Sequence, residues 1–93
     1  MAEVTAGTAR LINVGVRYFA AARSAAGSDS EELTVRDGVT VGDLVDDLSS
    51  RNPELARVLL RCSYLCDGVA VHDKAQSLHA GNTIDVLPPF AGG

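Results

Sequence analysis

Residues 11–18 read LINVGVRY, and residues 83–87 read TIDVL. In both stretches apolar side chains alternate with polar or small ones, which is typical of a β-strand with one buried face. Between them, residues 41–48 place apolar side chains at the i, i+3, i+4 and i+7 positions of a helix, and Thr40 can cap its first turn. Together with the shorter signals below, this pattern predicts an α+β fold, with helix on one face of a mixed sheet.

Shorter signals complete the predicted order of elements. The Ala-rich segment 19–26 is followed by a glycine and predicts a helical turn, and residues 33–36 predict a short second strand. Residues 52–62 begin with Asn-Pro and predict another helix, because asparagine caps well and proline suits the first helical position. Asp-Gly at 67–68, between two apolar runs, predicts a hairpin. The predicted order is strand, strand, main helix, strand, strand, strand.

Composition limits the class of protein. The chain has 93 residues, 46% of them apolar, which suits one globular domain with a limited core. Eight basic and twelve acidic side chains leave a formal net charge of −4. This balance argues against nucleic acid, and it is explained equally well by solubility or by docking on a basic partner. With no signal-peptide pattern and no membrane-length apolar run, we expect a cytoplasmic protein that does not enter a membrane.

Sequence patterns for enzymatic chemistry are missing. There is no glycine-rich phosphate loop and no nucleophile elbow. Asp43, Asp46 and Asp47 have the spacing of a solvated helix face rather than of a catalytic carboxylate pair. His72 and His79 fall on or near predicted turns, where we interpret them as incidental.

The two cysteines, Cys62 and Cys66, are predicted to be buried and inert. On an extended segment, four residue steps would hold them about 13 Å apart, too far for a disulfide. On a helix they would share a face, and a zinc site would then need His72 and His79, although no tight ligand spacing supports one. We therefore expect no metal site.

The end of the sequence, PPFAGG over residues 88–93, is the strongest functional candidate. Two prolines end the preceding strand and favour an extended backbone. Gly92 and Gly93 carry no Cβ and can pass through a narrow channel, which would present the Gly93 carboxylate to a partner's active site. The alternative is a loose end with two chance glycines. We expect a flexible N-terminal extension (1–10), a folded domain (11–87) and an extended tail (88–93).

Three segments resemble a known family. Residues 87–93 (LPPFAGG), 16–20 (VRYFA) and 80–86 (AGNTIDV) are similar to the C-terminus, the first strand and the last turn of the small subunits of molybdopterin synthase, the MoaD-type sulfur carriers. The tail alone is shared with the ThiS-type carriers of thiamine biosynthesis and with those of cysteine biosynthesis, whereas the first-strand segment points to the molybdopterin type. The chain departs from the family pattern at Phe90, where a smaller residue is usual, and in its N-terminal extension. Its helical region is longer than that of the thiamine carrier.

The resemblance implies a ubiquitin-like β-grasp fold with parallel first and last strands, and a carrier without catalytic activity or bound cofactor of its own. An E1-like adenylating and sulfurylating enzyme would use ATP to activate Gly93 and convert it to a thiocarboxylate. The large synthase subunit would accept the tail and direct the sulfur to the pterin precursor. Phe19 and Leu87 would form an apolar docking patch, although Phe19 is equally explained as a core residue. Further contacts would come from Pro88, Pro89, Phe90, Ala91 and Gly92.

Three other functions fit the same residues. They are a sulfur carrier for cysteine or thiamine biosynthesis, a ubiquitin-like modifier joined through Gly93 to lysines of other proteins, and an interaction module with an inert tail. A thiocarboxylate on the protein isolated from cells would exclude the inert module. A ladder of conjugates would indicate the modifier.

Overall fold

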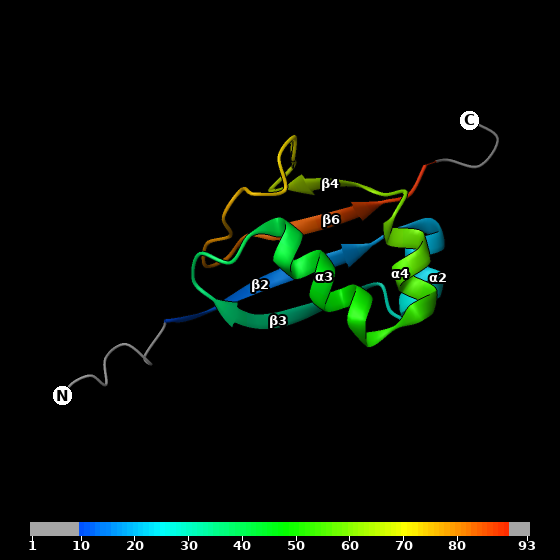
Figure 1. Cartoon of the computed structure of the whole chain (residues 1–93), viewed down its shortest axis with the longest axis horizontal. Coiled ribbons are helices and arrows are strands. Elements are labelled where there is room, and N and C mark those ends of the chain that lie inside the picture. Colours follow the sequence, from blue (N-terminus) through cyan, green and yellow to red (C-terminus); the bar gives the residue numbers. More distant parts are fainter. Residues whose placement is uncertain (1–9, 90–93) are drawn as a thin grey trace.

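The computed structural model describes residues 10–89, which form a five-stranded sheet in the order β3-β2-β6-β4-β5 and three helices (Figure 1). The strands are β2 (Leu11–Tyr18), β3 (Ser30–Arg36), β4 (Ser63–Cys66), β5 (Val69–Ala70) and β6 (Thr83–Leu87). The helices are α2 (Ala20–Ala26), α3 (Val41–Arg51) and α4 (Pro53–Leu59). The predicted α+β class and the predicted order of strands and main helix are confirmed.

The two strands at the centre of the sheet, β2 and β6, run parallel to each other. Gly15 lies opposite Thr83 and Tyr18 lies opposite Val86, so both strands end at the same end of the sheet. β3 and β4 flank this pair in antiparallel orientation, and β5 forms a hairpin with β4. Parallel first and last strands with a helix across one face are the β-grasp arrangement that the resemblance implies.

The core lies between the sheet and the helices. Along β2 every second side chain is buried, from Ile12 to Tyr18. α3 crosses this face of the sheet and buries Val41, Leu44 and Leu48 against it (Figure 1). α2 and α4 pack together at the end of the sheet where β6 stops. The main helix therefore covers the middle of the sheet. The two short helices, which bury Ala22, Leu55 and Leu59 in the core, lie beside the end of β6, where the tail leaves.

Helix starts follow the predicted capping chemistry. Thr40 Oγ1 accepts a hydrogen bond from the backbone N–H of Asp43, and the Asp43 carboxylate accepts one from the backbone N–H of Thr40, both at 3.0 Å. This reciprocal pair is a capping box. At α4, Asn52 Oδ1 accepts from the N–H groups of Glu54 and Leu55, with proline in the first turn. Both predicted helix starts are confirmed.

Two predicted boundaries differ from the structure. β3 spans Ser30–Arg36 rather than residues 33–36, because its polar first half pairs with β2 and needs no apolar pattern to do so. α4 ends at Leu59, whereas the sequence predicted helix to Cys62. The N–H groups of Arg61 and Cys62 bond to carbonyl oxygens three residues earlier, and this tighter turn ends the α-helix.

The predicted hairpin at Asp67-Gly68 is confirmed. Both residues have positive φ, 50° and 82°, as a tight turn between twisted strands requires. The Asp67 carboxylate also accepts hydrogen bonds from the Asn82 side chain at 2.7 Å and from the Thr83 N–H at 2.8 Å. The β4–β5 hairpin is therefore joined to the turn that precedes β6.

The predicted domain limits stay predictions, because residues 1–9 and 90–93 lie outside the described part of the chain. Among the helices of residues 10–89, none is long and apolar enough to cross a membrane.

Candidate functional site at the base of the tail

The last strand delivers the chain to one end of the sheet. Leu87 is half-buried, Pro88 is buried and Pro89 is exposed, so the chain leaves the folded domain after Pro88 rather than before it. The predicted tail residues Phe90, Ala91, Gly92 and Gly93, including the expected reactive carboxylate, lie outside the described residues. The described geometry is therefore that of the end of the sheet from which the tail leaves.

Phe19 stands beside this exit. Tyr18 pairs with Val86, so Phe19 and Leu87 each lie one residue beyond that pair, and strand alternation directs both away from the helices. The N–H of Phe19 donates to the carbonyl of Val86 at 3.3 Å. The Phe19 side chain is 39% exposed, which favours the docking patch over the core contact that the sequence left equally open. The structure brings together the two predicted patch residues.

The backbone around Phe19 is closely constrained. Phe19 is the N-cap of α2, and its carbonyl accepts hydrogen bonds from the N–H groups of Ala22 and Arg23 at 3.0 and 3.4 Å. The next residue, Ala20, has a φ of 51°, in the left-handed region that a residue with a Cβ rarely adopts. The chain accepts this strain where β2 turns directly into α2. The turn holds the exposed aromatic ring at the end of the sheet.

A charged pair that sequence reasoning missed lies next to Phe19. Arg17 Nε and Nη2 donate to the two carboxylate oxygens of Asp85 at 2.6 and 2.8 Å. This hydrogen bond, followed by the charge of Asp85, raises the pKa of Arg17. The guanidinium carbon also lies 5.7 Å from the centre of the Phe19 ring, within the range of a cation–π contact. The pair joins β2 to β6 on the face without helices. The only sequence signal was that both residues occupy outward positions on strands expected to be parallel neighbours.

The tail base also borders a small basic pocket. This hollow of about 330 Å³ lies between α2, α4 and the end of β6. Its lining combines two arginines, Arg57 and Arg61, with the smaller or apolar residues Ala21, Val58, Pro88 and Pro89. Within residues 10–89 the one ion pair of Arg57 is a long 3.9 Å contact to Glu54. Although the chain is acidic overall, it therefore presents positive charge where the tail begins. Sequence reasoning did not single out these arginines, because a helical pattern does not indicate which distant segment a side chain meets.

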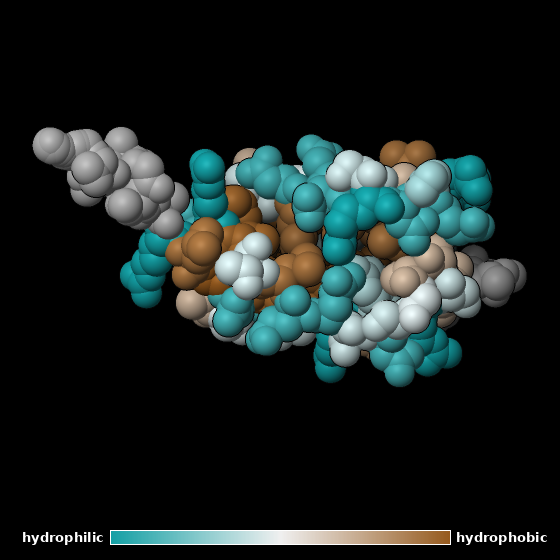
Figure 2. Space-filling model, turned by 90° about the horizontal axis from the view of Figure 1, so that it is seen from below, coloured by the Kyte–Doolittle hydropathy of each residue, from teal (hydrophilic) through white to brown (hydrophobic). Residues whose placement is uncertain are grey.

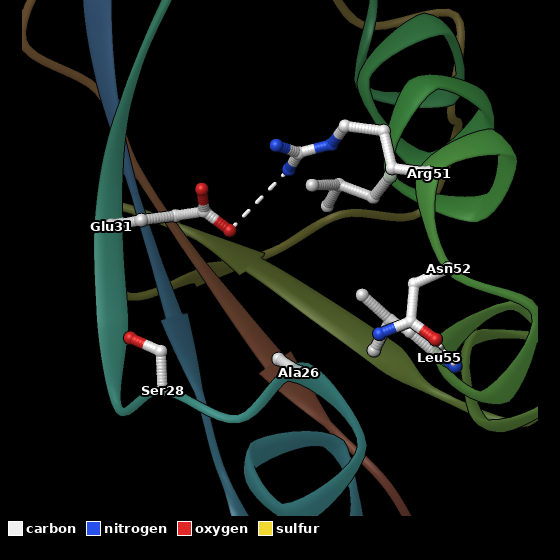
Figure 3. Close-up of a pocket in the computed structure, with 7 residues that line it drawn as sticks. Ala26, Ser28, Glu31, Arg51, Asn52 and Leu55 are labelled. Atoms are coloured by element: carbon white, nitrogen blue, oxygen red, sulfur yellow. Dashed lines mark hydrogen bonds and ion pairs between the residues drawn. The ribbon is translucent and has the colours of Figure 1, made fainter.

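A second hollow, of about 300 Å³, lies where the helices meet β3 and is not part of the tail base (Figure 3). Glu31 of β3 accepts hydrogen bonds from the Tyr18 hydroxyl at 2.5 Å and from Arg51 of α3 at 3.4 Å. Burial, and then this bond to Glu31, raise the pKa of Tyr18. The Asn52 side chain donates to the Ala25 carbonyl at 2.9 Å and so ties the α3–α4 junction to α2. These contacts hold the helices onto the sheet.

The cysteines take no part in the tail base. Both are free, and burial raises the pKa of each thiol, which lowers its reactivity. Cys66 is buried as predicted, whereas Cys62 is only half-buried, because it follows the end of α4 instead of lying within a helix. Among residues 10–89, no group of three or more His, Cys, Asp or Glu side chains could hold a metal ion.

The sequence profile of the ThiS family matches residues 16–93, from the second half of β2 to the last glycine. The chain belongs to the ThiS family. A member of similar size, the molybdopterin synthase sulfur carrier subunit of Chlamydomonas reinhardtii, is 29% identical over 84 residues, which are 88% of this chain and 100% of that protein. The family profile therefore matches both the tail base and the Gly-Gly end.

Several solved structures share the fold of this chain. The HVO 2177 protein of Haloferax volcanii is 30% identical, superposes with a TM-score of 0.78, and aligns 89% of this chain with 88% of its own. SAMP1 from the same organism is 28% identical, with a TM-score of 0.76 over 87% of this chain and 99% of its own. A ubiquitin of Caldiarchaeum subterraneum, 13% identical, shares the fold alone, with a TM-score of 0.61 over 90% of this chain and 100% of its own. The predicted ubiquitin-like β-grasp fold is confirmed.

Proposed function

We propose that this ThiS-family chain is the sulfur carrier subunit of a molybdopterin synthase, and that it carries sulfur as a thiocarboxylate on Gly93. The observation that carries the proposal is the family match through residue 93, together with a relative that bears this name and is matched over its whole length. The end of the sheet from which the tail leaves also supports the proposal. β6 and a buried proline deliver the tail to an end of the sheet that presents Phe19 and Leu87.

The chemistry follows from the carboxylate. An oxygen of the Gly93 carboxylate would attack the α-phosphorus of ATP in an E1-like enzyme, and pyrophosphate would leave. Hydrosulfide would then attack the acyl carbon and expel AMP, which leaves a thiocarboxylate. A persulfide donor would instead leave an acyl disulfide, and a second thiol of the partner would have to cleave its S–S bond to release the thiocarboxylate. The described residues hold no cluster suited to stabilise these steps, so the partner enzymes would supply the cations and oxyanion contacts. This chain would supply a narrow, extended substrate in the form of its own tail.

The second partner would be the large synthase subunit. The Chlamydomonas relative is by name a subunit of molybdopterin synthase. We infer that the corresponding surface here is formed by Phe19, Leu87 and Pro89, because these residues surround the tail exit on its exposed side. Arg57 and Arg61 would face acidic groups of a partner at the rim of the same surface. The last tail residues, with Phe90 as anchor, would enter the partner's channel.

A second candidate function is protein modification, because SAMP1 of Haloferax volcanii, which is 28% identical to this chain, is by name a small archaeal modifier protein. The two functions share adenylation of Gly93 and differ in the acceptor. Sulfur transfer needs a free thiocarboxylate, whereas modification needs an amide bond to a lysine.

The deciding experiment is intact-mass analysis of the chain isolated from its own cells, with and without the cognate adenylating enzyme. We expect the mass increase of one oxygen replaced by sulfur, dependent on that enzyme, and co-purification of the large synthase subunit. Deleting Gly93 is the matched control and should remove the modified species. An unmodified mass in every sample would contradict the proposal, and a ladder of larger conjugates with no thiocarboxylate would favour the modifier.

A further inference from the structure

The edge strand β3 has one side that is available to pair with another strand. Within residues 10–89 it pairs with β2 alone, and its other side faces outward. The N–H of Tyr18 bonds to the carbonyl of Asp29, and the N–H of Asp37 bonds to that of Arg10, which sets the phase of the ladder. Antiparallel hydrogen bonds alternate between the two sides of a strand. It follows that Glu32, Thr34 and Arg36 point their backbone N–H and C=O groups away from the sheet.

Apolar surface lies beside this free edge. Leu33 and Val35 point toward the helices but remain only partly buried. Val35 lines a hollow of about 300 Å³ between β3 and α3, together with Val39 and Leu44. Figure 2, which views the molecule from the side of β3, shows apolar atoms gathered on this face. Edges of this kind are normally blunted by lysine, proline, a bulge or a covering loop, because they recruit other strands.

The charged residues of β3 differ in whether they already have a partner within the described part of the chain. Near the start of the strand, Glu31 already accepts hydrogen bonds from Tyr18 and from Arg51, the second of which is drawn in Figure 3. Glu32 and Arg36 are both exposed, and neither forms an ion pair with any residue in the described range 10–89. The two free charges have opposite signs and lie two residues on either side of Thr34. The segment Glu32–Arg36 is therefore complementary to itself when reversed.

We propose that β3 pairs antiparallel with β3 of a second copy of this chain, about a twofold axis at Thr34. In this register Glu32 lies opposite the partner's Arg36, and Arg36 lies opposite the partner's Glu32. Thr34 exchanges backbone hydrogen bonds with the partner's Thr34. Leu33 lies opposite the partner's Val35 on the helix side. Directly opposed residues of unlike charge, and opposed apolar residues, stabilise a pair of strands.

Charge favours this register over those in which the twofold axis is moved by two residues along β3. A twofold axis at Glu32 would place two glutamates opposite each other, and an axis at Arg36 would do the same with two arginines. Like charges directly opposite destabilise a strand pair. Such a dimer joins identical patches and closes on itself. Because the strands are antiparallel, the two β6 ends lie at opposite ends of the joined sheet, so both tails stay accessible and the proposed function is unaffected.

The test is the oligomeric state of the full chain, measured by sedimentation equilibrium and light scattering over a range of concentrations. The variants are E32R, R36E and the double exchange E32R/R36E. We expect wild type to dimerise with increasing concentration, and each single reversal to weaken dimerisation by about tenfold or more. The double exchange should restore it, because each opposed pair regains unlike charges. An equimolar mixture of the two single variants should form a heterodimer for the same reason.

Restoration in the mixture also shows that the single variants are folded, since each must present an intact edge. A wild-type chain that stays monomeric up to about millimolar concentration would overturn the proposal. So would dimers that are indifferent to the single reversals, or a double exchange that fails to restore them. None of these results depends on adenylation of Gly93, so failure of this proposal and failure of the proposed function are told apart.

Discussion

The two ends of β2 each expose a large apolar residue, yet their surroundings differ. At the tail end, Phe19 is 39% exposed, its N–H bonds to β6, and Arg17 lies over its ring. At the far end, Leu11 is 64% exposed and lies opposite Arg36 of the edge strand. By exposed fraction alone, Leu11 would be the stronger candidate for a docking residue. Phe19, however, is fixed by these contacts next to the place where the tail leaves, as expected of a residue in a docking surface.

The largest effect should come from changing the tail itself. Deleting Gly93, or appending one residue after it, moves the reactive carboxyl group by about 3.3 Å along the channel. Because misplacement by 1 Å can cost about 100-fold in rate, we expect adenylation to be abolished. ATP–pyrophosphate exchange with the cognate enzyme measures this. Thermal melts should show stability unchanged within about 0.5 kcal/mol. Adenylation of the extended chain at the wild-type rate, without trimming, would refute the role of Gly93.

The next largest effect compares the two ends of β2 in partner binding. Phe19→Ala should weaken binding of the large subunit by about 2 kcal/mol, as expected for an aromatic anchor at an interface, and the same size of loss is expected for Phe90→Ala. Leu11→Ala is the matched control, because it removes a more exposed apolar side chain from the same strand. Calorimetric titration should find wild-type affinity for that control. Equal losses for Phe19→Ala and Leu11→Ala would show that the tail end has no special role.

A smaller effect is expected in the capping box of α3. Thr40→Ala should lower the free energy of unfolding by about 1 kcal/mol and leave partner binding unchanged, because it removes the cap without touching the tail base. Chemical denaturation measures the first quantity and titration the second. A wild-type unfolding free energy would show that the cap contributes nothing.

The same capping box predicts a pH dependence. Hydrogen bonds from the backbone and then the side chain of Thr40 lower the pKa of Asp43. Its contribution is therefore present above the unfolded-state pKa of about 3.9 and is lost as the pH falls through the lowered folded-state value. Asp43→Asn removes this titration. The acid limb of its stability curve should be flatter than that of wild type, and identical limbs would contradict the assignment.

The smallest effect is expected at the N-terminus. Removal of residues 1–8 should leave the thermal midpoint within about 5 °C of wild type, because their polar, aperiodic sequence precedes the first strand. A larger drop would show that the extension packs on the domain.

Local patterns in the sequence determined much of this fold. Alternation indicated β2 and β6, helical spacing indicated α3, and side-chain chemistry indicated the Thr40 and Asn52 caps and the Asp67-Gly68 turn. Each of these signals depends on residues a few positions apart, which is why they can be read without the tertiary structure. The Gly-Gly tail was also visible in the sequence, and the resemblance of the surrounding segments identified the family.

Only the tertiary structure decided the features that join distant segments. The Arg17–Asp85 pair spans 68 positions of sequence. The basic pocket joins α4 to Pro88, and the polar half of β3 became a strand because β2 lies beside it. Which residues of β3 face outward follows from the phase of its hydrogen bonds with β2. Such contacts depend on how the elements pack, and the periodicity of a single segment carries no information about its neighbour.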